Sequence, residues 1–331
     1  MKKPLCLALA VLLLFCCRFS AAAEDQTFLF CWENEYLAAV NGEVFLVTRG
    51  RGLFQDTSTL WSVTGGKKEW RLTRNRITQI TPHRDGLLIH SNHPNLLEWA
   101  TGYPGTRTVE LYRPEEKKAS TMFSWNSEQG GVYDFTCGGT LYHIINENGQ
   151  GRLFSVEDGE ETLQFTNDGY IGNGSNFLIL SREKRSWPPW KTEMKYRILD
   201  PSDGRILETS GYLEVTTELL LYGVLLQDRL YYLSPQGLSM WDFAADAGTV
   251  VIPKAERKIS SFSITRNSVL LFCGDDKTGH YADYCDLHTG ALIRTFPLSG
   301  YCWDVCVADG WMYAYTGKLE IIHLTTGEHM Q

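Results

Sequence analysis

The fold is decided by a short stretch in which two apolar runs flank a tight polar turn: RILDPSDGRIL, residues 197–207. A second copy of this pattern, DLHTGALI, occupies residues 286–293. A two-residue turn of the Asn-Gly or Asp-Gly type between apolar runs is the strongest short-range signal for a β-hairpin. The two stretches therefore predict hairpins, and further copies follow along the chain.

These turns recur in two interleaved series. In the first series a polar turn precedes an apolar strand, and the turns are Asn41-Gly42, Asp85-Gly86, Gly138-Gly139, Asn173-Gly174, Gln227-Asp228, Arg266-Asn267 and Asp309-Gly310. In the second series the turn separates two strands, and the turns are Gly65-Gly66, Pro114-Glu115, Asp158-Gly159, Asp203-Gly204, Ala247-Gly248, Thr289-Gly290 and Thr326-Gly327. The first series repeats about every 45 residues, and the second about every 37 to 50.

Two hairpin turns in each period give four strands per repeat. Seven four-stranded repeats arranged radially form a β-propeller, so we predict an all-β, seven-bladed propeller with antiparallel blades. Helical periodicity is not sustained anywhere, and β-branched and aromatic residues dominate the apolar runs. A pair of β-sandwiches or a solenoid would also contain many short strands, but the regular pairing of turns favours the propeller.

The two ends of the chain suggest how the ring closes. Only four residues follow Gly327, which makes a poor outer strand for the last repeat. The strand-like segment Thr27–Trp32 precedes the first inner strand, near Leu37 to Val40, and belongs to no repeat. We expect this N-terminal strand to pair with the last repeat, which would remove an exposed sheet edge.

The segment LDPSDGRIL (199–207), and more weakly LHTGAL (287–292), resembles the Leu-Asp-x-x-Thr-Gly-x-x-Leu hairpin of quinoprotein-type β-propellers. The resemblance implies a fold and no chemistry. The docking repeat of the enzymatic members, Ala-x-Asp-x-x-Thr-Gly…Trp, is missing, so we expect neither pyrroloquinoline quinone nor another cofactor. The WD-repeat signature is missing too, because Trp241-Asp242 and Trp303-Asp304 have no Gly-His partner at the right offset. The Ser-x-Asp-x-Gly-x-x-Trp box of sialidase-like propellers does not occur either.

The first residues have the pattern of a secretory signal peptide. Two lysines precede an apolar run at residues 5–17, and Ser-Ala-Ala-Ala at 20–23 supplies a small-residue cleavage site. The apolar run is too short to span a membrane. We therefore expect residues 1–23 to be a cleaved signal peptide and residues 24–331 to form the propeller domain.

Composition agrees with an exported, acidic domain. The chain carries 31 Lys+Arg against 39 Asp+Glu, a formal net charge of −8, and loss of residues 1–23 makes it −11. Such a balance argues against nucleic-acid binding, which needs a basic surface, and no later segment is apolar enough to cross a bilayer. We expect a secreted, periplasmic or cell-envelope location. A short uncleaved anchor and lipid attachment at Cys16 or Cys17 are the alternatives.

Six cysteines follow the signal peptide, and an exported chain permits disulfides. Cys273 and Cys285 flank a predicted hairpin loop and are the best candidate disulfide pair. The alternative is that both serve as small, buried, apolar residues. Cys302 and Cys306 lie four residues apart in a strand-like run, which is too far to bridge.

Two long loops are candidates for a binding surface. In a propeller, loops between the second and third strands share one face with the connections to the next blade, and insertions there build binding surfaces. The candidate residues come from loops at 91–107 and 181–193, and they are His93, Trp99, Tyr103, Arg185, Trp187, Trp190 and Lys191. The Trp-Pro-Pro-Trp rings, held by prolines, suit sugars, peptides or partner proteins. Alternatively, the two tryptophans pack the loop onto its own blade.

A second group of candidates lies on the innermost strands. Asp134 and Asp304 occur in Tyr-Asp-Phe and Trp-Asp-Val triplets at matching innermost-strand positions, where carboxylates of a central channel would hold a cation or water. Two acids from non-adjacent blades make a poor metal site, so the alternative is that they only line a wet channel. No residue spacing indicates a metal centre or a catalytic residue.

These observations favour a non-catalytic binding or scaffold propeller that recognises a protein partner, peptide or glycan through its Trp-rich loop face. We expect a monomer. An extracytoplasmic enzyme (a hydrolase, lyase or quinone-dependent oxidoreductase) with a site at the channel mouth is the alternative. A third hypothesis is an assembly module of a larger envelope complex, which would expose an apolar patch on a blade.

Overall fold

The structure, a computed structural model, describes residues 36–51, 56–93, 106–126, 132–186, 191–208, 223–254, 257–265, 267–275 and 277–330. The predicted signal peptide, residues 1–23, and the segment Thr27–Trp32 lie outside these ranges. The described residues form seven four-stranded antiparallel sheets, each built from four consecutive strands, and one short 3₁₀ turn, Thr64–Gly66. The predicted fold, a seven-bladed β-propeller, is confirmed.

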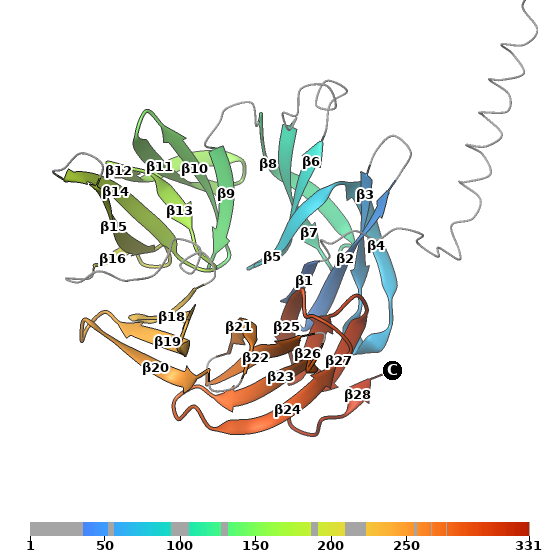
Figure 1. The fold of residues 1–331 in the computed structure, drawn as a ribbon. Helices are drawn as coiled ribbons and strands as arrows, with labels where there is room; N and C mark the ends of the chain where they lie inside the picture. The colour runs from blue at the N-terminus through green and yellow to red at the C-terminus, as the bar shows by residue number, and fades with distance from the viewer. Residues whose placement is uncertain are drawn as a thin grey trace, which may run out of the picture.

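Figure 1 shows the blades arranged around a common centre, with β1, β5, β9, β21 and β25 on the inner side. Blade 1 contains β1 (Tyr36–Val40), β2 (Glu43–Arg51), β3 (Asp56–Ser62) and β4 (Glu69–Asn75). Blade 2 contains β5 (Ile77–His83), β6 (Gly86–His93), β7 (Thr106–Arg113) and β8 (Lys118–Asn126). Blade 3 contains β9 (Val132–Cys137), β10 (Thr140–Glu147), β11 (Gln150–Glu157) and β12 (Glu160–Asn167).

The remaining four blades follow the same order from the centre outward. Blade 4 contains β13 (Ile171–Asn173), β14 (Leu178–Ser186), β15 (Lys191–Asp200) and β16 (Arg205–Leu207). Blade 5 contains β17 (Val224–Leu226), β18 (Arg229–Ser234), β19 (Gly237–Asp242) and β20 (Ala247–Pro253). Blade 6 contains β21 (Ile259–Ile264), β22 (Ser268–Asp275), β23 (Gly279–Asp286) and β24 (Leu292–Leu298). Blade 7 contains β25 (Asp304–Ala308), β26 (Trp311–Tyr315), β27 (Leu319–His323) and β28 (His329–Met330).

The second strand of each blade is apolar on both faces because each blade packs against two neighbours. In β2, Phe45 and Val47 belong to the apolar cluster between blades 1 and 2. Val44 and Leu46, which alternate with them, belong to the cluster between blades 7 and 1. Side chains alternate between the faces of a strand, so one run such as Val-Phe-Leu-Val supplies two separate cores. Each of the seven joints between blades holds one such cluster.

The first predicted series of turns joins the first strand of a blade to the second, and the second series joins the third strand to the fourth. One turn was placed wrongly, since Ala247 and Gly248 begin β20. The hairpin turns earlier, at residues 243–246, where the Asp242 carboxylate accepts the backbone N–H groups of Ala244 and Ala245. Gly248 instead packs against Trp241, whose ring lies 3.1 Å from the position of an added Cβ.

Blade 7 differs from the prediction for ring closure. Its outermost strand is β28, in which His329 and Met330 pair with Ile322 and Ile321 of β27. The few residues after Gly327 therefore do form a fourth strand, and the Thr27–Trp32 segment that was expected there lies outside the described ranges. Blades 1 and 7 meet through β1 and β25, where the Leu37 backbone N–H donates to Asp304 Oδ2 over 2.7 Å.

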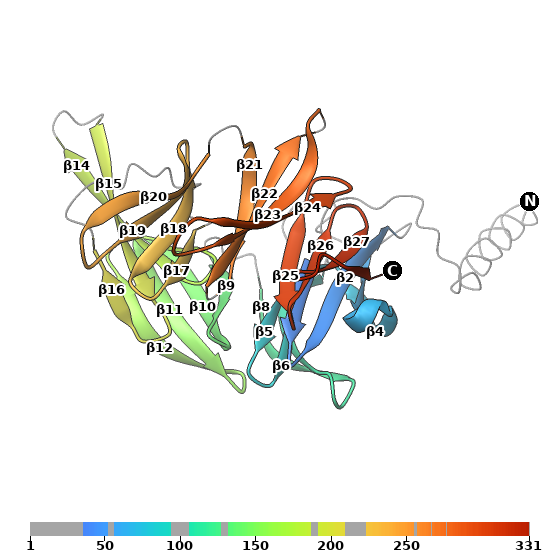
Figure 2. The ribbon, with the colours of Figure 1, turned by 90° about the horizontal axis from the view of Figure 1, so that it is seen from below.

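The meander gives the ring two distinct faces. The turn face carries the turns between first and second strands and between third and fourth strands, such as the β5–β6 and β11–β12 turns at the bottom of Figure 2. The loop face carries the connections between second and third strands and those between successive blades. The β14–β15 and β22–β23 ends lie on this side, at the top of Figure 2.

Candidate functional site

An exposed pair of aromatic rings lies on the loop face, in the connection between β24 and β25. Tyr301 and Trp303 are 38% and 54% exposed. Their ring centroids lie 4.8 Å apart with a 64° angle between the planes. The His280 ring, on β23, lies 6.2 Å from the Tyr301 ring at 89°. The three rings thus form a series of tilted faces and not one flat platform.

The backbone that carries these rings is fastened to blade 7. The Trp303 backbone N–H donates to the Tyr315 carbonyl over 2.9 Å. The Ser299 backbone N–H and hydroxyl donate to Glu320 Oε1 over 3.0 and 2.6 Å, and the Thr316 hydroxyl donates to the same oxygen. Burial alone would raise the pKa of Glu320, but these hydrogen bonds outweigh it and lower that pKa. The rings are therefore exposed on an anchored connection, close to an ionised carboxylate.

The loop residues predicted to bind are only partly within the described ranges. Trp99, Tyr103, Trp187 and Trp190 lie outside them. The other three predicted residues are strand residues next to the loops: His93 ends β6, Arg185 is in β14 and Lys191 begins β15. The structure describes the backbone of these three and not their side chains. All three lie toward the ends of their strands at the loop face, which also carries Tyr301 and Trp303.

Asp134 lies on the innermost strand β9 and joins blade 3 to blade 2. Its carboxylate is hydrogen-bonded to Nδ1 of His90 on β6, and the Thr81 hydroxyl on β5 lies 3.2 Å from Nε2 of the same ring. The side chains of His90 and Asp134 are 5% and 11% exposed. Burial alone would raise the pKa of Asp134, but the charge and hydrogen bond of His90 outweigh it and hold the pKa below its usual value. We name Thr81, His90 and Asp134 the inner clasp.

Asp304, on the innermost strand β25, joins blade 7 to blade 1 through backbone groups. Oδ2 accepts the Leu37 N–H, and Oδ1 accepts the Val305 N–H over 2.8 Å. Burial raises the pKa of Asp304 to about 6, and these two hydrogen bonds offset only part of that effect. The carboxylate therefore titrates close to neutral pH.

The two aspartates do not occupy matching positions, contrary to the sequence interpretation. Cys137 and Ala308 are the last residues of their strands before the turn. Asp134 lies three residues before Cys137, whereas Asp304 lies four residues before Ala308. A shift of one residue moves a side chain to the other face of a strand. Asp134 consequently faces the preceding blade and Asp304 the following one.

The joint between blades 2 and 3 contains a second histidine–carboxylate pair that sequence reasoning missed. Nδ1 of His143 on β10 is hydrogen-bonded to Glu161 on β12. The His143 ring packs against Trp125 and Phe123, with centroid distances of 5.4 and 5.0 Å. His143 Nε2 and Trp125 Nε1 are buried and have no hydrogen-bond partner within the described part of the chain. The only sequence signal is a histidine inside an apolar run, which fits an ordinary core residue equally well.

The predicted disulfide between Cys273 and Cys285 is not formed. Both cysteines are free and buried. In the β22–β23 hairpin Cys273 lies opposite Tyr281, and Cys285 lies opposite Val269. The two cysteines are therefore offset by four residues, about 13 Å along the strands, whereas a disulfide needs Cα atoms within about 7 Å. Both thiols serve as apolar members of the cluster between blades 5 and 6, and burial raises the pKa of Cys273 to about 12.

Two further properties bear on function. Within the described ranges, no group of three or more His, Cys, Asp or Glu side chains is arranged to hold a metal ion. The same residues include no helix with the length and apolar character needed to cross a bilayer.

No protein-family model matches the chain, and no curated protein matches it either. Solved structures with similar folds do exist. The propeller domain of the Trilobed protease from Pyrococcus furiosus, described as having an open velcro topology, is 11% identical with a TM-score of 0.58, and the match covers 90% of this chain and 97% of that one. Saccharomyces cerevisiae Sqt1 is 12% identical with a TM-score of 0.50, over 92% of this chain and 87% of that one.

A prolyl endopeptidase is also similar, with 14% identity, a TM-score of 0.59 and coverage of 88% of this chain. This chain spans about half of that protein, since the match covers 47% of it. Identities this low carry information about the fold and not about activity. The comparisons thus agree with the strand order: the chain has the fold of a β-propeller.

Proposed function

We propose that this chain is a non-catalytic binding propeller whose loop face recognises a peptide segment of a partner protein. The observation that carries the proposal is the Tyr301–Trp303 ring pair, which is exposed although its backbone is anchored to blade 7. Trp and Tyr are the residue types most enriched at binding hot spots. An anchored connection loses little conformational freedom when a ligand binds, which favours affinity.

The tilt of the rings favours a peptide over a glycan. A sugar stacks best on a broad flat ring surface, whereas rings set at 64° and 89° enclose an angle. Such an angle accepts a compact apolar side chain such as leucine or proline, as in the aromatic grooves that bind proline-rich peptides. The predicted loop tryptophans, Trp187 and Trp190, would extend this surface along the same face.

The inner clasp has the order of groups found in a nucleophile–base–acid chain, yet we assign it a structural role. His90 is only 4% exposed and lies inside the joint between blades, where a substrate has no access. The proposal includes the repeat type: the repeat resembles that of quinoprotein-type propellers, and no cofactor is proposed. Export is likewise part of it, and N-terminal sequencing of the secreted protein should then begin at Glu24.

The test is a peptide selection with a matched glycan array. Immobilised protein is used to select binders from a random peptide display library, and the dissociation constants of the best peptides are measured for three variants. Trp303→Ala and Tyr301→Ala should weaken binding about tenfold or more, because each removes a ring that contacts the ligand. Trp70→Ala is the control, since Trp70 is 61% exposed but lies on the outer strand β4.

Peptide affinities that are equal in Trp303→Ala and Trp70→Ala would place the binding surface elsewhere and overturn the proposal. Binding on the glycan array without any selected peptide would overturn the choice of ligand. If Trp303→Ala then lost this glycan binding, the same rings would be assigned to a sugar. Thermal unfolding of each variant establishes that the fold is unchanged.

A further inference from the structure

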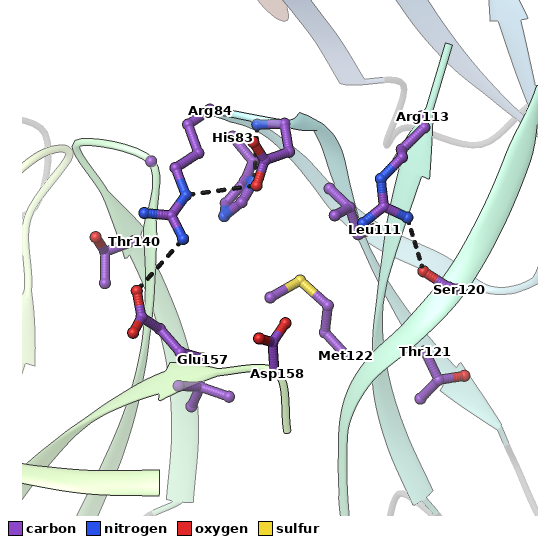
Figure 3. Close-up of a pocket in the computed structure, with 13 residues that line it drawn as sticks. His83, Arg84, Leu111, Arg113, Ser120, Thr121, Met122, Thr140, Glu157 and Asp158 are labelled. Atoms are coloured by element: carbon purple, nitrogen blue, oxygen red, sulfur yellow. Dashed lines mark hydrogen bonds and ion pairs between the residues drawn. The ribbon is translucent and has the colours of Figure 1, made fainter. Parts of the chain in front are cut away.

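A second site is suggested by a cavity of about 210 Å³ on the turn face, away from the Tyr301–Trp303 pair. It lies at the joint between blades 2 and 3, between the β5–β6 turn, the β9–β10 turn and the β11–β12 turn. Figure 3 shows its walls, with residues of blade 2 on one side and residues of blade 3 on the other.

The wall from blade 2 supplies hydrogen-bond donors. His83 lines the cavity and is 8% exposed, and its Nδ1 accepts the backbone N–H of Asp85 over 3.1 Å. The other ring nitrogen, Nε2, consequently carries the proton of the neutral ring, and it has no hydrogen-bond partner among the described residues. Arg113 donates one N–H to the Ser120 hydroxyl over 3.4 Å, which leaves further N–H groups of its guanidinium for a ligand.

Burial keeps the His83 ring uncharged. Desolvation lowers the pKa of His83, and the nearby Arg84 and Arg113 lower it further, while Asp85 opposes the shift. The ring is therefore neutral at pH 7 and acts as a donor without adding charge to the cavity.

The wall from blade 3 supplies acceptors. Asp158 has a φ of +50°, so it stands at the tip of the β11–β12 turn, and its carboxylate lies across the cavity from His83 (Figure 3). No hydrogen bond or ion pair engages that carboxylate within the described ranges. The neighbouring Glu157 accepts from Arg84 over 3.4 Å, in an ion pair that bridges the two blades.

The base of the cavity is apolar. Leu111 and Val156 line it and are buried, and the Met122 side chain lies between Leu111 and Asp158 (Figure 3). A second cavity, at blade 1, is lined by residues that include Glu43, Glu69 and Arg71. Arg71 there is already bound by both Glu43 and Glu69.

The charges of the lining indicate the class of ligand. Two arginines face three carboxylates, so the lining carries one net negative charge and disfavours a simple anion such as phosphate. The unpaired donors and the unpaired acceptor lie on opposite walls, which suits a molecule with a carboxylate at one end and an ammonium at the other. We propose that this cavity binds a small apolar α-amino acid, with its carboxylate at Arg113 and His83 and its ammonium at Asp158.

The apolar base then receives the side chain of the amino acid. The cavity volume of about 210 Å³ suits a whole amino acid of the size of leucine or methionine. Specificity follows from the two walls together, because a ligand that lacks its carboxylate leaves the buried His83 ring without a partner, and one that lacks its ammonium loses the charge attraction to Asp158.

The experiment measures binding of three probes by isothermal titration calorimetry: L-leucine, L-leucine methyl ester and N-acetyl-L-leucine. The full chain should bind L-leucine, and each blocked form, which lacks one charged end, should bind about tenfold more weakly or worse. Asp158→Asn should weaken L-leucine binding by a similar factor, since asparagine tolerates positive φ but carries no charge. Asp309→Asn is the matched control, because Asp309 is also a left-handed turn residue, with φ +49°, and lies in blade 7.

Three results would overturn the proposal: no binding of L-leucine at millimolar concentration, equal binding of a blocked form, or equal affinities in Asp158→Asn and Asp309→Asn. Thermal unfolding of both variants separates loss of the site from loss of the fold. The outcome is independent of the peptide site, because Trp303→Ala leaves this cavity unchanged.

Discussion

Asp134 and Asp304 are both largely buried on innermost strands, and both connect neighbouring blades, but their environments differ. Asp134 meets the imidazole of His90, whereas Asp304 meets only the backbone N–H groups of Leu37 and Val305 within the described residues. The imidazole stabilises the charged form of Asp134 more than burial disfavours it, so its pKa falls. At Asp304 burial prevails, and its pKa rises to about 6.

The comparison shows that burial of a carboxylate does not fix its effect on stability. An ionised carboxylate with a complementary ring stabilises the folded state above the unfolded-state pKa of about 4. A buried carboxylate without a cationic partner binds its proton more tightly in the folded state, so its ionisation destabilises the fold. The contributions of Asp134 and Asp304 to the free energy of unfolding should therefore change in opposite directions as pH rises.

The largest effect is expected from breaking the inner clasp. Asp134→Ala should lower the free energy of unfolding by about 3–5 kcal/mol at pH 7, because it leaves the buried His90 ring without its partner. Denaturant titration measures this loss. Glu147→Ala in the same blade removes an exposed ion pair with Arg152 and should change stability by less than about 1 kcal/mol. Similar losses in both variants would contradict a special role for the clasp.

At neutral pH, Asp304→Asn should raise the free energy of unfolding, whereas Asp134→Ala lowers it. The folded-state pKa of about 6 lies about two units above the value of 3.8 for a free carboxyl group. The wild-type protein should therefore lose about 2–3 kcal/mol of stability relative to the asparagine variant as pH rises from about 4 to about 7, most of it below pH 6. Denaturant titrations at pH 4, 5, 6 and 7 measure this difference.

The same pH series on Asp134→Asn is the control for the comparison. There the wild-type advantage should persist from pH 7 down to about pH 4 and disappear only below it, because the pKa of Asp134 is lowered in the folded state. A constant difference between wild type and Asp304→Asn from pH 4 to 7 would show that Asp304 is solvated.

The sequence was sufficient to predict the blades because their signals are local. Turn residues with left-handed backbone, such as Asn41 and Asp309 with φ of 51° and 49°, mark hairpins within a few positions. The continuous apolar run of β2 marks a strand buried on both faces. The outer strand β28 was missed because a strand of two residues has no pattern of its own.

The contacts between blades could not be predicted because they join residues that are distant in sequence. His90 and Asp134 are 44 positions apart, and Asp304 contacts Leu37 across 267. Whether an aspartate faces one neighbour or the other depends on a single residue of register, which the turn positions did not resolve. The exposure of Trp303 and the cavity at His83 likewise depend on how neighbouring blades pack.

The smallest predicted effect tests whether the inner clasp acts as one unit. Thr81→Val removes the hydroxyl that lies 3.2 Å from His90 Nε2 and should cost about 1 kcal/mol. In the Asp134→Ala background the same change should cost much less, because the ring has already lost the partner that fixes its orientation. Thr59→Val, which alters an exposed Thr–Thr contact on blade 1, should be nearly neutral in both backgrounds. Full additivity of Thr81→Val and Asp134→Ala would mean that His90 is held by packing, and the contrast with Asp304 would then depend on the single ion pair alone.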